Sequence, residues 1–185
     1  MGETSVTSRL WQASIAVLFS VLAAAPLAAQ EVTHLSSNGD ATPEIGPETN
    51  LPLPRFVSLK AREANVRRGP SLSHRIDWVF QRKGMPLQVI AEYGHWRRVI
   101  DRDGQGGWVH YTMLSGARTV IVEQDTLTLR HRANTQSRET AELERGVIAR
   151  LRECGDGWCE VTAGGYRGWA PQAVFWGIAD GEAIN

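Results

Sequence analysis

The 185-residue chain contains one pattern twice, and this duplication restricts its fold more than any other feature. Landmark residues recur in the same order, at offsets that fall only from 63 to 61 residues along the chain. The landmarks and their counterparts are Arg67 and Arg130, Gly84 and Gly146, Trp96 and Trp158, Trp108 and Trp169, and Leu114 and Phe175. A repeat of about sixty residues indicates one compact unit per copy. We therefore predict two domains, at residues 55–117 and 118–177.

Apolar residues within each copy recur with a period of two, which is typical of strands rather than helices. Expected strands in copy one are Phe56–Leu59, Leu87–Ile90, Trp96–Ile100 and Trp108–Val109. Those in copy two are Thr119–Val122, Leu127–Arg130, Val147–Leu151, Trp158–Val161 and Tyr166–Ala170. Residues 139–144 fit either a strand or a helical turn. About five short strands in sixty residues predict an all-β chain of two small, strongly curved barrels in tandem.

The N-terminal residues 1–29 have the layout of a secretory signal peptide. An apolar stretch from Ile15 to Ala25 is followed by small residues that end near Ala29. This stretch is shorter than the ~20 residues that a membrane-spanning helix needs. The alternative is an uncleaved anchor, because the longer segment from Trp11 could cross a bilayer. With cleavage, the mature protein begins near Gln30, is periplasmic or secreted, and has no membrane contact.

Residues 30–54 contain four prolines and four acidic residues but neither Lys nor Arg. Such a composition predicts a flexible, Pro-rich acidic linker. Its end, Leu51–Arg55, weakly resembles a polyproline ligand, although a segment stiffened by proline is the simpler interpretation. Residues 178–185 are expected to form a tail.

The only two cysteines, Cys154 and Cys159, flank a Gly-Asp-Gly sequence that is typical of a hairpin turn. Cysteines facing each other on neighbouring strands suit a disulfide, and an oxidising compartment favours one. The closed loop is small, so we expect a stabilisation of only about 2 kcal/mol. A redox pair or half of a metal site are the alternatives, but the spacing differs from redox motifs and further ligands are not close in sequence.

Copy one contains Asn65–Ser71, Gly84, Gly94-His95-Trp96 and Gly107-Trp108-Val109, in this order. At these landmarks it resembles the bacterial SH3-like (SH3b) family. Copy two is a weaker match. It has Ala133-Asn134-Thr135 in place of the Gly-Pro-Ser turn, and its Gly168-Trp169-Ala170-Pro171 is similar to the last-strand motif of SH3 barrels. From Arg55 to Gly177 the chain is similar to exported two-domain SH3-like proteins of uncharacterised function.

The resemblance implies a non-catalytic binding module whose partner is peptidoglycan or its peptides. Polyproline-binding SH3 domains are a weaker resemblance, because a Pro and a Tyr lie beside the ligand in them. This chain has His110 and Met113 at the matching places of copy one, and Pro171 and Val174 in copy two. The resemblance therefore implies poor binding of polyproline.

Strand parity makes Trp96 the first candidate for a ligand contact. If Val99 fills the barrel, Trp96 lies on the outer face, where a tryptophan can stack on sugar or pack on peptide. The alternative is that Trp96 covers the open end of the barrel as part of the core. Tyr93 and Tyr111 flank the turns of copy one and could form the rim of a groove.

Charge differs between the two copies although the whole chain has a net charge of zero. Copy one carries 11 Lys and Arg against 5 Asp and Glu, whereas copy two carries 8 of each. Arg67, Arg68, Arg97 and Arg98 are the densest candidates for a face that accepts carboxylates. A solvated surface, or contact with the acidic linker, is the alternative. The zero net charge argues against a nucleic-acid partner.

Signs of catalysis are missing from the sequence. The five histidines have no metal-ligand spacing, the serines lack a nucleophile-elbow context, and no glycine-rich phosphate loop leads into a helix. We therefore expect no enzyme, no catalytic residues, no metal and no cofactor. Two hypotheses remain: an exported module that binds peptidoglycan or envelope peptides through copy one, or an assembly module for another envelope protein without affinity for the cell wall.

Overall fold

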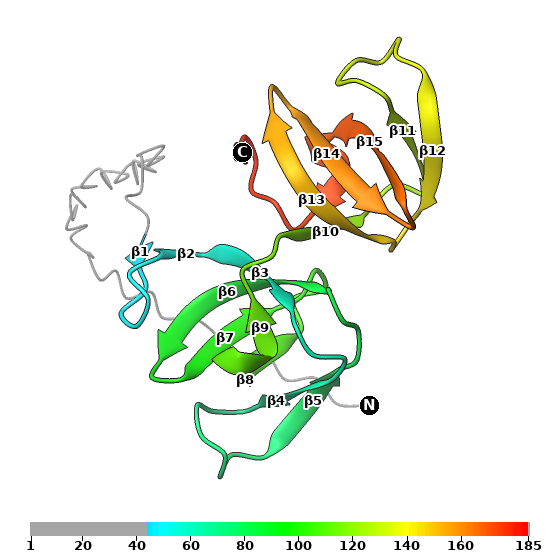
Figure 1. Ribbon diagram of the computed structural model, residues 1–185. Coiled ribbons are helices and arrows are strands. Elements are labelled where there is room, and N and C mark those ends of the chain that lie inside the picture. The colour runs from blue at the N-terminus through cyan, green and yellow to red at the C-terminus, as the bar shows by residue number, and fades with distance from the viewer. Residues whose placement is uncertain (1–43, 185) are drawn as a thin grey trace, which may run out of the picture. The chain divides into compact units, whose positions relative to one another are not determined.

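The computed structural model describes residues 44–184, which form strands and two 3-10 helices. The predicted signal peptide, and the predicted linker up to residue 43, lie outside these residues. Within the described part of the chain, no helix has the length and hydropathy that crossing a bilayer requires. Two seven-stranded antiparallel sheets, one per copy, dominate the fold (Figure 1). The prediction of an all-β chain with two units of the same kind is confirmed.

The first sheet has the strand order β5-β4-β8-β7-β6-β3-β9. Its strands are β3 (Arg55–Leu59), β4 (Ala64–Arg67), β5 (Ile76–Phe80), β6 (Pro86–Tyr93), β7 (Trp96–Ile100), β8 (Gly106–His110) and β9 (Leu114–Ser115). A 3-10 helix, η1 (Tyr111–Met113), joins the last two. Strand β5 was not predicted, because Ile76, Trp78 and Val79 all remain exposed and its sequence therefore does not alternate.

The second sheet repeats this topology as β12-β11-β15-β14-β13-β10-β16. Its strands are β10 (Thr119–Val122), β11 (Thr126–Arg130), β12 (Glu139–Glu144), β13 (Ile148–Gly155), β14 (Trp158–Ala163), β15 (Tyr166–Pro171) and β16 (Phe175–Trp176). The helix η2 (Gln172–Val174) corresponds to η1. Residues 139–144, which fitted either a strand or a helical turn, form β12 and pair with β11.

The two copies also share their irregularities. The β4–β5 pairing shifts register after Val66, and the β11–β12 pairing shifts after Leu129. Arg67 lies opposite Trp108 in copy one, and Arg130 lies opposite Trp169 in copy two. Since bulges bend strands, shared positions give both sheets the same local bend. The backbone therefore supports the residue correspondence that the sequence landmarks predicted.

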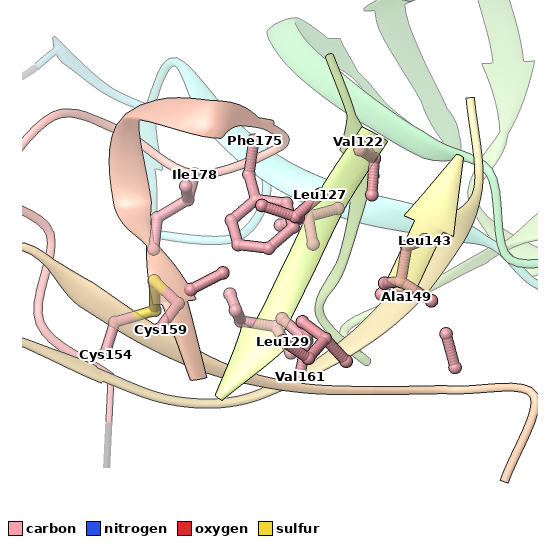
Figure 2. Packing of buried hydrophobic residues seen from close by; sticks show 14 residues of the cluster. Val122, Leu127, Leu129, Leu143, Ala149, Cys154, Cys159, Val161, Phe175 and Ile178 are labelled. Carbon is pink, nitrogen blue, oxygen red and sulfur yellow. A yellow bond between two sulfur atoms is a disulfide. The ribbon is translucent and has the colours of Figure 1, made fainter. Parts of the chain in front are cut away.

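Each copy encloses its own hydrophobic core. Core one consists of Leu53, Leu59, Ala64, Val66, Phe80, Leu87, Val89, Val99 and Val109. In core two the side chains of Leu127, Leu129, Val161 and Phe175 converge beside the disulfide (Figure 2). Alternation is visible in β4, a strand that was not predicted, where Ala64 and Val66 are buried and Asn65 is exposed. A period of two thus puts every second side chain inside the barrel.

The described end of the predicted linker is attached to copy one rather than free of it. Strand β1 (Glu44–Ile45) pairs with β2 (Pro52–Leu53), and Leu53 is part of core one. The turn between these strands is held by Glu92 of β6, which accepts hydrogen bonds from the backbone amides of Glu48 and Thr49, each at 3.0 Å. The composition of the linker could not indicate this attachment, because the attachment depends on a contact with Glu92, which is far along the chain.

The cysteines of β13 and β14 form the expected disulfide. Cys154 and Cys159 lie directly opposite each other, with their Cα atoms 4.2 Å apart. The backbone N–H and C=O of Cys154 bond instead to Ile184, so the two cysteines form a non-hydrogen-bonded pair, the closer type. Asp156 and Gly157 both have positive φ, as a two-residue hairpin turn requires.

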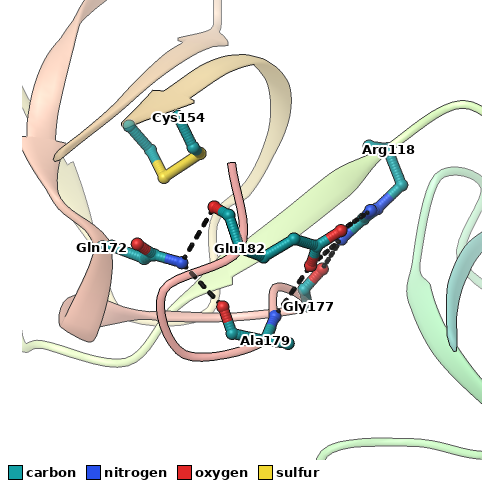
Figure 3. The surroundings of a disulfide bond; sticks show 7 residues. Arg118, Cys154, Gln172, Gly177, Ala179 and Glu182 are labelled. Atoms are coloured by element: carbon teal, nitrogen blue, oxygen red, sulfur yellow. Dashed lines mark hydrogen bonds and ion pairs between the residues drawn. A yellow bond between two sulfur atoms is a disulfide. The ribbon is translucent and has the colours of Figure 1, made fainter. Parts of the chain in front are cut away.

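The C-terminal tail packs on copy two beside this disulfide (Figure 3). Gln172 Nε2 donates to the carbonyl oxygen of Ala179 at 2.7 Å, and Arg118 pairs with Glu182 at 2.5 Å. The hydrogen bonds from Arg118 lower the pKa of Glu182 and outweigh the opposing effect of burial. Because Ile178 is also buried, residues 178–184 belong structurally to the second unit.

Candidate functional site

A groove of about 520 Å³ lies on the outer face of copy one. Strand β4 supplies Asn65 and Arg67, the following loop supplies Leu72, and Trp96 begins β7 on the other side. The remaining residues that line it are Glu63, Ala64, His110 and Met113. The groove therefore combines an apolar wall with polar and charged groups, which is the usual composition of a ligand site.

Trp96 was interpreted either as an outward-facing ligand contact or as a core residue that covers the open end of the barrel, and the structure agrees with part of each interpretation. Val99 is completely buried and Arg98 is exposed, so Trp96 faces outward from the barrel as parity predicts. It is nevertheless only 9% exposed. The ring of His110, its partner across the strands, meets Trp96 edge-on with the centroids 5.4 Å apart. Trp96 thus forms a fixed wall of the groove with a small accessible surface.

Arg67 has a structural task as well as a place in the groove. Its Nη1 donates to the carbonyl oxygens of Leu72 at 3.0 Å and His74 at 2.6 Å. The corresponding Arg130 makes a similar bond to the carbonyl oxygen of Ser137 at 2.8 Å. In both copies this arginine therefore holds the loop that follows the bulged strand, and in copy one it thereby positions Leu72.

The predicted tyrosines do not line the groove. Tyr93 lies across the β6–β7 hairpin from Trp96 and is 64% exposed. Tyr111 contacts two histidine rings, with centroid distances of 5.6 Å to His95 and 5.1 Å to His110. The rings of His95 and Tyr111 thus both pack against the ring of His110, which lines the groove. Sequence reasoning placed His110 and Met113 beside the ligand position of SH3 domains but did not select them as site residues.

The structure brings the other predicted arginines together around a second hollow of about 370 Å³. Arg67, Arg68 and Arg98 line it with Asp77, and Trp108 and glycines of β8 complete it. Asp77 is paired with Arg68 at 3.1 Å and also with Arg75. The hydrogen bond from Arg68, the largest effect, and the bond from Arg75 lower the pKa of Asp77 against the opposing effect of desolvation.

Arg97 does not belong to this arginine face. It is buried and lies 3.4 Å from Glu92, whose carboxylate also binds Arg55 at 2.6 Å. Thr49 Oγ1 donates to the same carboxylate at 2.7 Å. The sequence does not indicate this buried cluster, because Glu92 is far along the chain from Thr49 and Arg55 and no motif connects the three residues.

Copy two has a different hollow. It measures about 280 Å³ and is lined by Trp158, Trp169, Glu153 and Asp156, of which only the two tryptophans correspond to residues that line the groove or the arginine hollow of copy one. Within residues 44–184, no group of three or more His, Cys, Asp or Glu side chains is placed to hold a metal ion. The cationic hollow and the apolar groove therefore distinguish copy one from copy two.

Comparison with known proteins identifies the fold. A family model described as the bacterial SH3 domain matches the chain twice, at residues 60–116 and 123–177. No curated protein matches the chain. The solved structure of NlpC2 from Trichomonas vaginalis is similar at 9% identity and a TM-score of 0.32, covering 66% of this chain and 48% of that one. NlpC1 from the same organism has the same identity and TM-score and covers 71% of this chain and 48% of that one.

The chain thus spans about half the length of these two structures, and at 9% identity the likeness says nothing about what it binds. The family model is a different matter, because its two matches cover more than half of the chain and each falls on one of the two sheets. The resemblance inferred from the Gly-Trp landmarks is confirmed. The chain belongs to the bacterial SH3 domain family and contains two copies of the domain.

Proposed function

We propose that this chain is an exported, non-catalytic binding protein of the bacterial envelope, which recognises peptidoglycan or its peptides through copy one. The observation that carries the proposal is the groove between Trp96, His110, Met113 and Leu72. A preformed groove loses little conformational entropy on binding. The disulfide supports export, because such bonds persist in oxidising compartments.

A second candidate is an assembly module for another envelope protein. It is favoured by the exposed apolar side chains of β5, which is the edge strand of the first sheet. By register, Ile76, Trp78 and Val79 correspond to Glu139, Ala141 and Glu142 of copy two. An exposed apolar edge strand is a surface to which a partner protein can add a strand.

Retention on insoluble peptidoglycan separates the two functions. Purified mature protein should sediment with peptidoglycan under the first and remain in the supernatant under the second. Leu72→Ser, on an exposed side chain, should weaken retention roughly threefold to tenfold because it removes an apolar contact without disturbing the core. Trp96→Ala should weaken it further, since it removes one wall of the groove.

The matched controls are Thr135→Ser and Trp158→Ala, at the corresponding positions of copy two. They should leave retention unchanged. Thermal melts establish that each variant is folded, which matters most for the buried Trp96. Retention that is unaffected in the folded Leu72 and Trp96 variants would contradict the groove as the binding site.

A further inference from the structure

The arginine hollow occupies a place that copy two fills with its own side chains. Arg98 corresponds to Glu160, and Gly106 corresponds to Arg167. In copy two, Arg167 Nη2 donates to Glu160 Oε2 at 2.6 Å, and Arg152 lies 3.9 Å from the same oxygen. Copy two therefore neutralises this position with an internal ion pair.

Copy one leaves the same position open. Gly106 has no side chain to fill it, and none fits there: a Cβ would lie 1.9 Å from the carbonyl oxygen of Val99. A Cβ on Gly107 would lie 2.8 Å from the carbonyl oxygen of Arg67. The close approach of the strands thus requires both glycines, and the hollow of about 370 Å³ is a fixed feature of this fold.

The hollow also has uncompensated positive charge. Three arginines and one aspartate line it, which leaves two positive charges in excess. Arg68 is partly engaged by Asp77, and Arg67 by two carbonyl oxygens of its own loop. Within residues 44–184, the guanidinium of Arg98 has neither an ion pair nor a hydrogen bond. Arg98 therefore has all of its donors available to an outside acceptor.

We propose that this hollow is a carboxylate-binding site, with Arg98 and Arg68 as the donors. A guanidinium presents parallel N–H groups that match the two oxygens of a carboxylate. Arg67 lines both the hollow and the apolar groove, so one ligand can contact both. This inference rests on the proposed function. Together, the carboxylate site and the apolar groove make the ligand of copy one a peptide that carries a free carboxylate close to an apolar group.

Small probes test the site without the unidentified ligand. N-acetylglutamate carries two carboxylates and its diamide, N-acetylglutaminamide, carries none, so both are titrated into ¹⁵N-labelled mature protein while the Arg Nε–Hε and Trp indole resonances are followed. N-acetylglutamate should shift Arg98 and Trp108, and N-acetylglutaminamide should not. Equal shifts from the two probes would overturn the proposal, as would tighter binding of inorganic phosphate.

Arginine variants locate the response. Arg98→Gln should weaken N-acetylglutamate binding roughly threefold to fivefold, as expected for one exposed ion pair. Arg98→Glu, which introduces the residue type of copy two, should abolish it. Arg150→Gln, an exposed arginine of copy two, is the matched control and should have no effect. Unchanged binding in Arg98→Gln would exclude the site.

Failure of this proposal and failure of the proposed function are distinguishable. If N-acetylglutamate binds at Arg98 but the protein is not retained by peptidoglycan, the carboxylate site stands and the cell-wall ligand is wrong. If retention depends on Leu72 but no probe reaches Arg98, the groove stands and the carboxylate site is wrong.

Discussion

Glu92 is the residue whose environment is most unlike that of a free side chain. Its carboxylate is fully buried but accepts hydrogen bonds from Thr49, Arg55 and the backbone at Glu48. Burial, the largest single effect, raises its pKa, and the combined hydrogen bonds and the positive charge of Arg55 lower it further than burial raises it. The pKa of Glu92 therefore lies below its ordinary value of 4.5.

Because the pKa of Glu92 is lower in the folded protein than in the unfolded chain, the direction in which the free energy of unfolding changes with pH is known. The stabilisation by Glu92 is complete above the ordinary pKa and disappears as the pH falls through the lowered pKa. Glu92→Gln should reduce the free energy of unfolding at pH 7 by about 2 to 4 kcal/mol, because Arg55 and Arg97 lose their buried counter-charge. It should also flatten the loss of stability below about pH 4.

Urea unfolding of wild type and variant from pH 7 to pH 2 measures both effects. Glu142→Gln, at an exposed position of β12, is the control and should behave as wild type. Parallel stability curves for Glu92→Gln and wild type on acidification would show that Glu92 does not couple the fold to protons.

Individual residues also show what the sequence could predict and what it could not. Parity placed Val99 inside the barrel, which agrees with the structure, and Trp96 on the outer face as an accessible side chain, whereas Trp96 is only 9% exposed. It could not give the burial of Trp96, because the covering ring of His110 comes from another strand. The three arginines around the hollow were selected from their density in the sequence, but that density could not show that Arg67 holds its own loop or that Arg97 is buried beside Glu92.

At the scale of elements, the best-predicted feature is the hairpin of β13 and β14. The Gly-Asp-Gly sequence predicted the position of the hairpin turn, and the cysteines on either side of it predicted the disulfide. The least predictable are β5, whose apolar residues are exposed, and the β1–β2 pair, which depends on Glu92. Local patterns therefore identified most strands that bury one face, although β4 was not predicted, and missed strands without a buried face.

The disulfide should contribute modestly to stability. The two cysteines are separated by only 5 positions, so the chain-entropy effect of the crosslink is about 2 kcal/mol. Unfolding and refolding in the presence of reductant should lower the free energy of unfolding of the second unit by this amount. The double variant Cys154→Ala/Cys159→Ala is the control, because its stability should not respond to reductant. An equal response from that variant would assign the effect to reductant itself.

At the scale of the whole molecule, duplication has produced two units with one topology and different surfaces. Copy one has a cationic hollow and an apolar groove, whereas copy two has ion pairs and an acidic lining. The landmarks revealed the shared topology because glycines and tryptophans at strand ends are needed in both. The surfaces differ through single exchanges, such as Gly106 in copy one against Arg167 in copy two, and such an exchange can be recognised only once the strand register is known.

Export is the prediction that concerns the whole chain. If residues 1–29 are a cleaved signal peptide, the mature protein should begin near Gln30. N-terminal sequencing of the protein from the envelope fraction measures this directly. An intact Met1 on that protein would instead favour the retained anchor.

The attachment of residues 46–51 to Glu92 has a mechanical consequence. Tension on the chain ahead of Glu44 would be borne first by the β1–β2 pair and the bonds to Glu92, before it reached β3. This short hairpin would peel away under load while the barrel behind it stayed intact. If copy one binds its ligand in the groove as proposed, that ligand would remain bound when the protein is pulled from its N-terminal side.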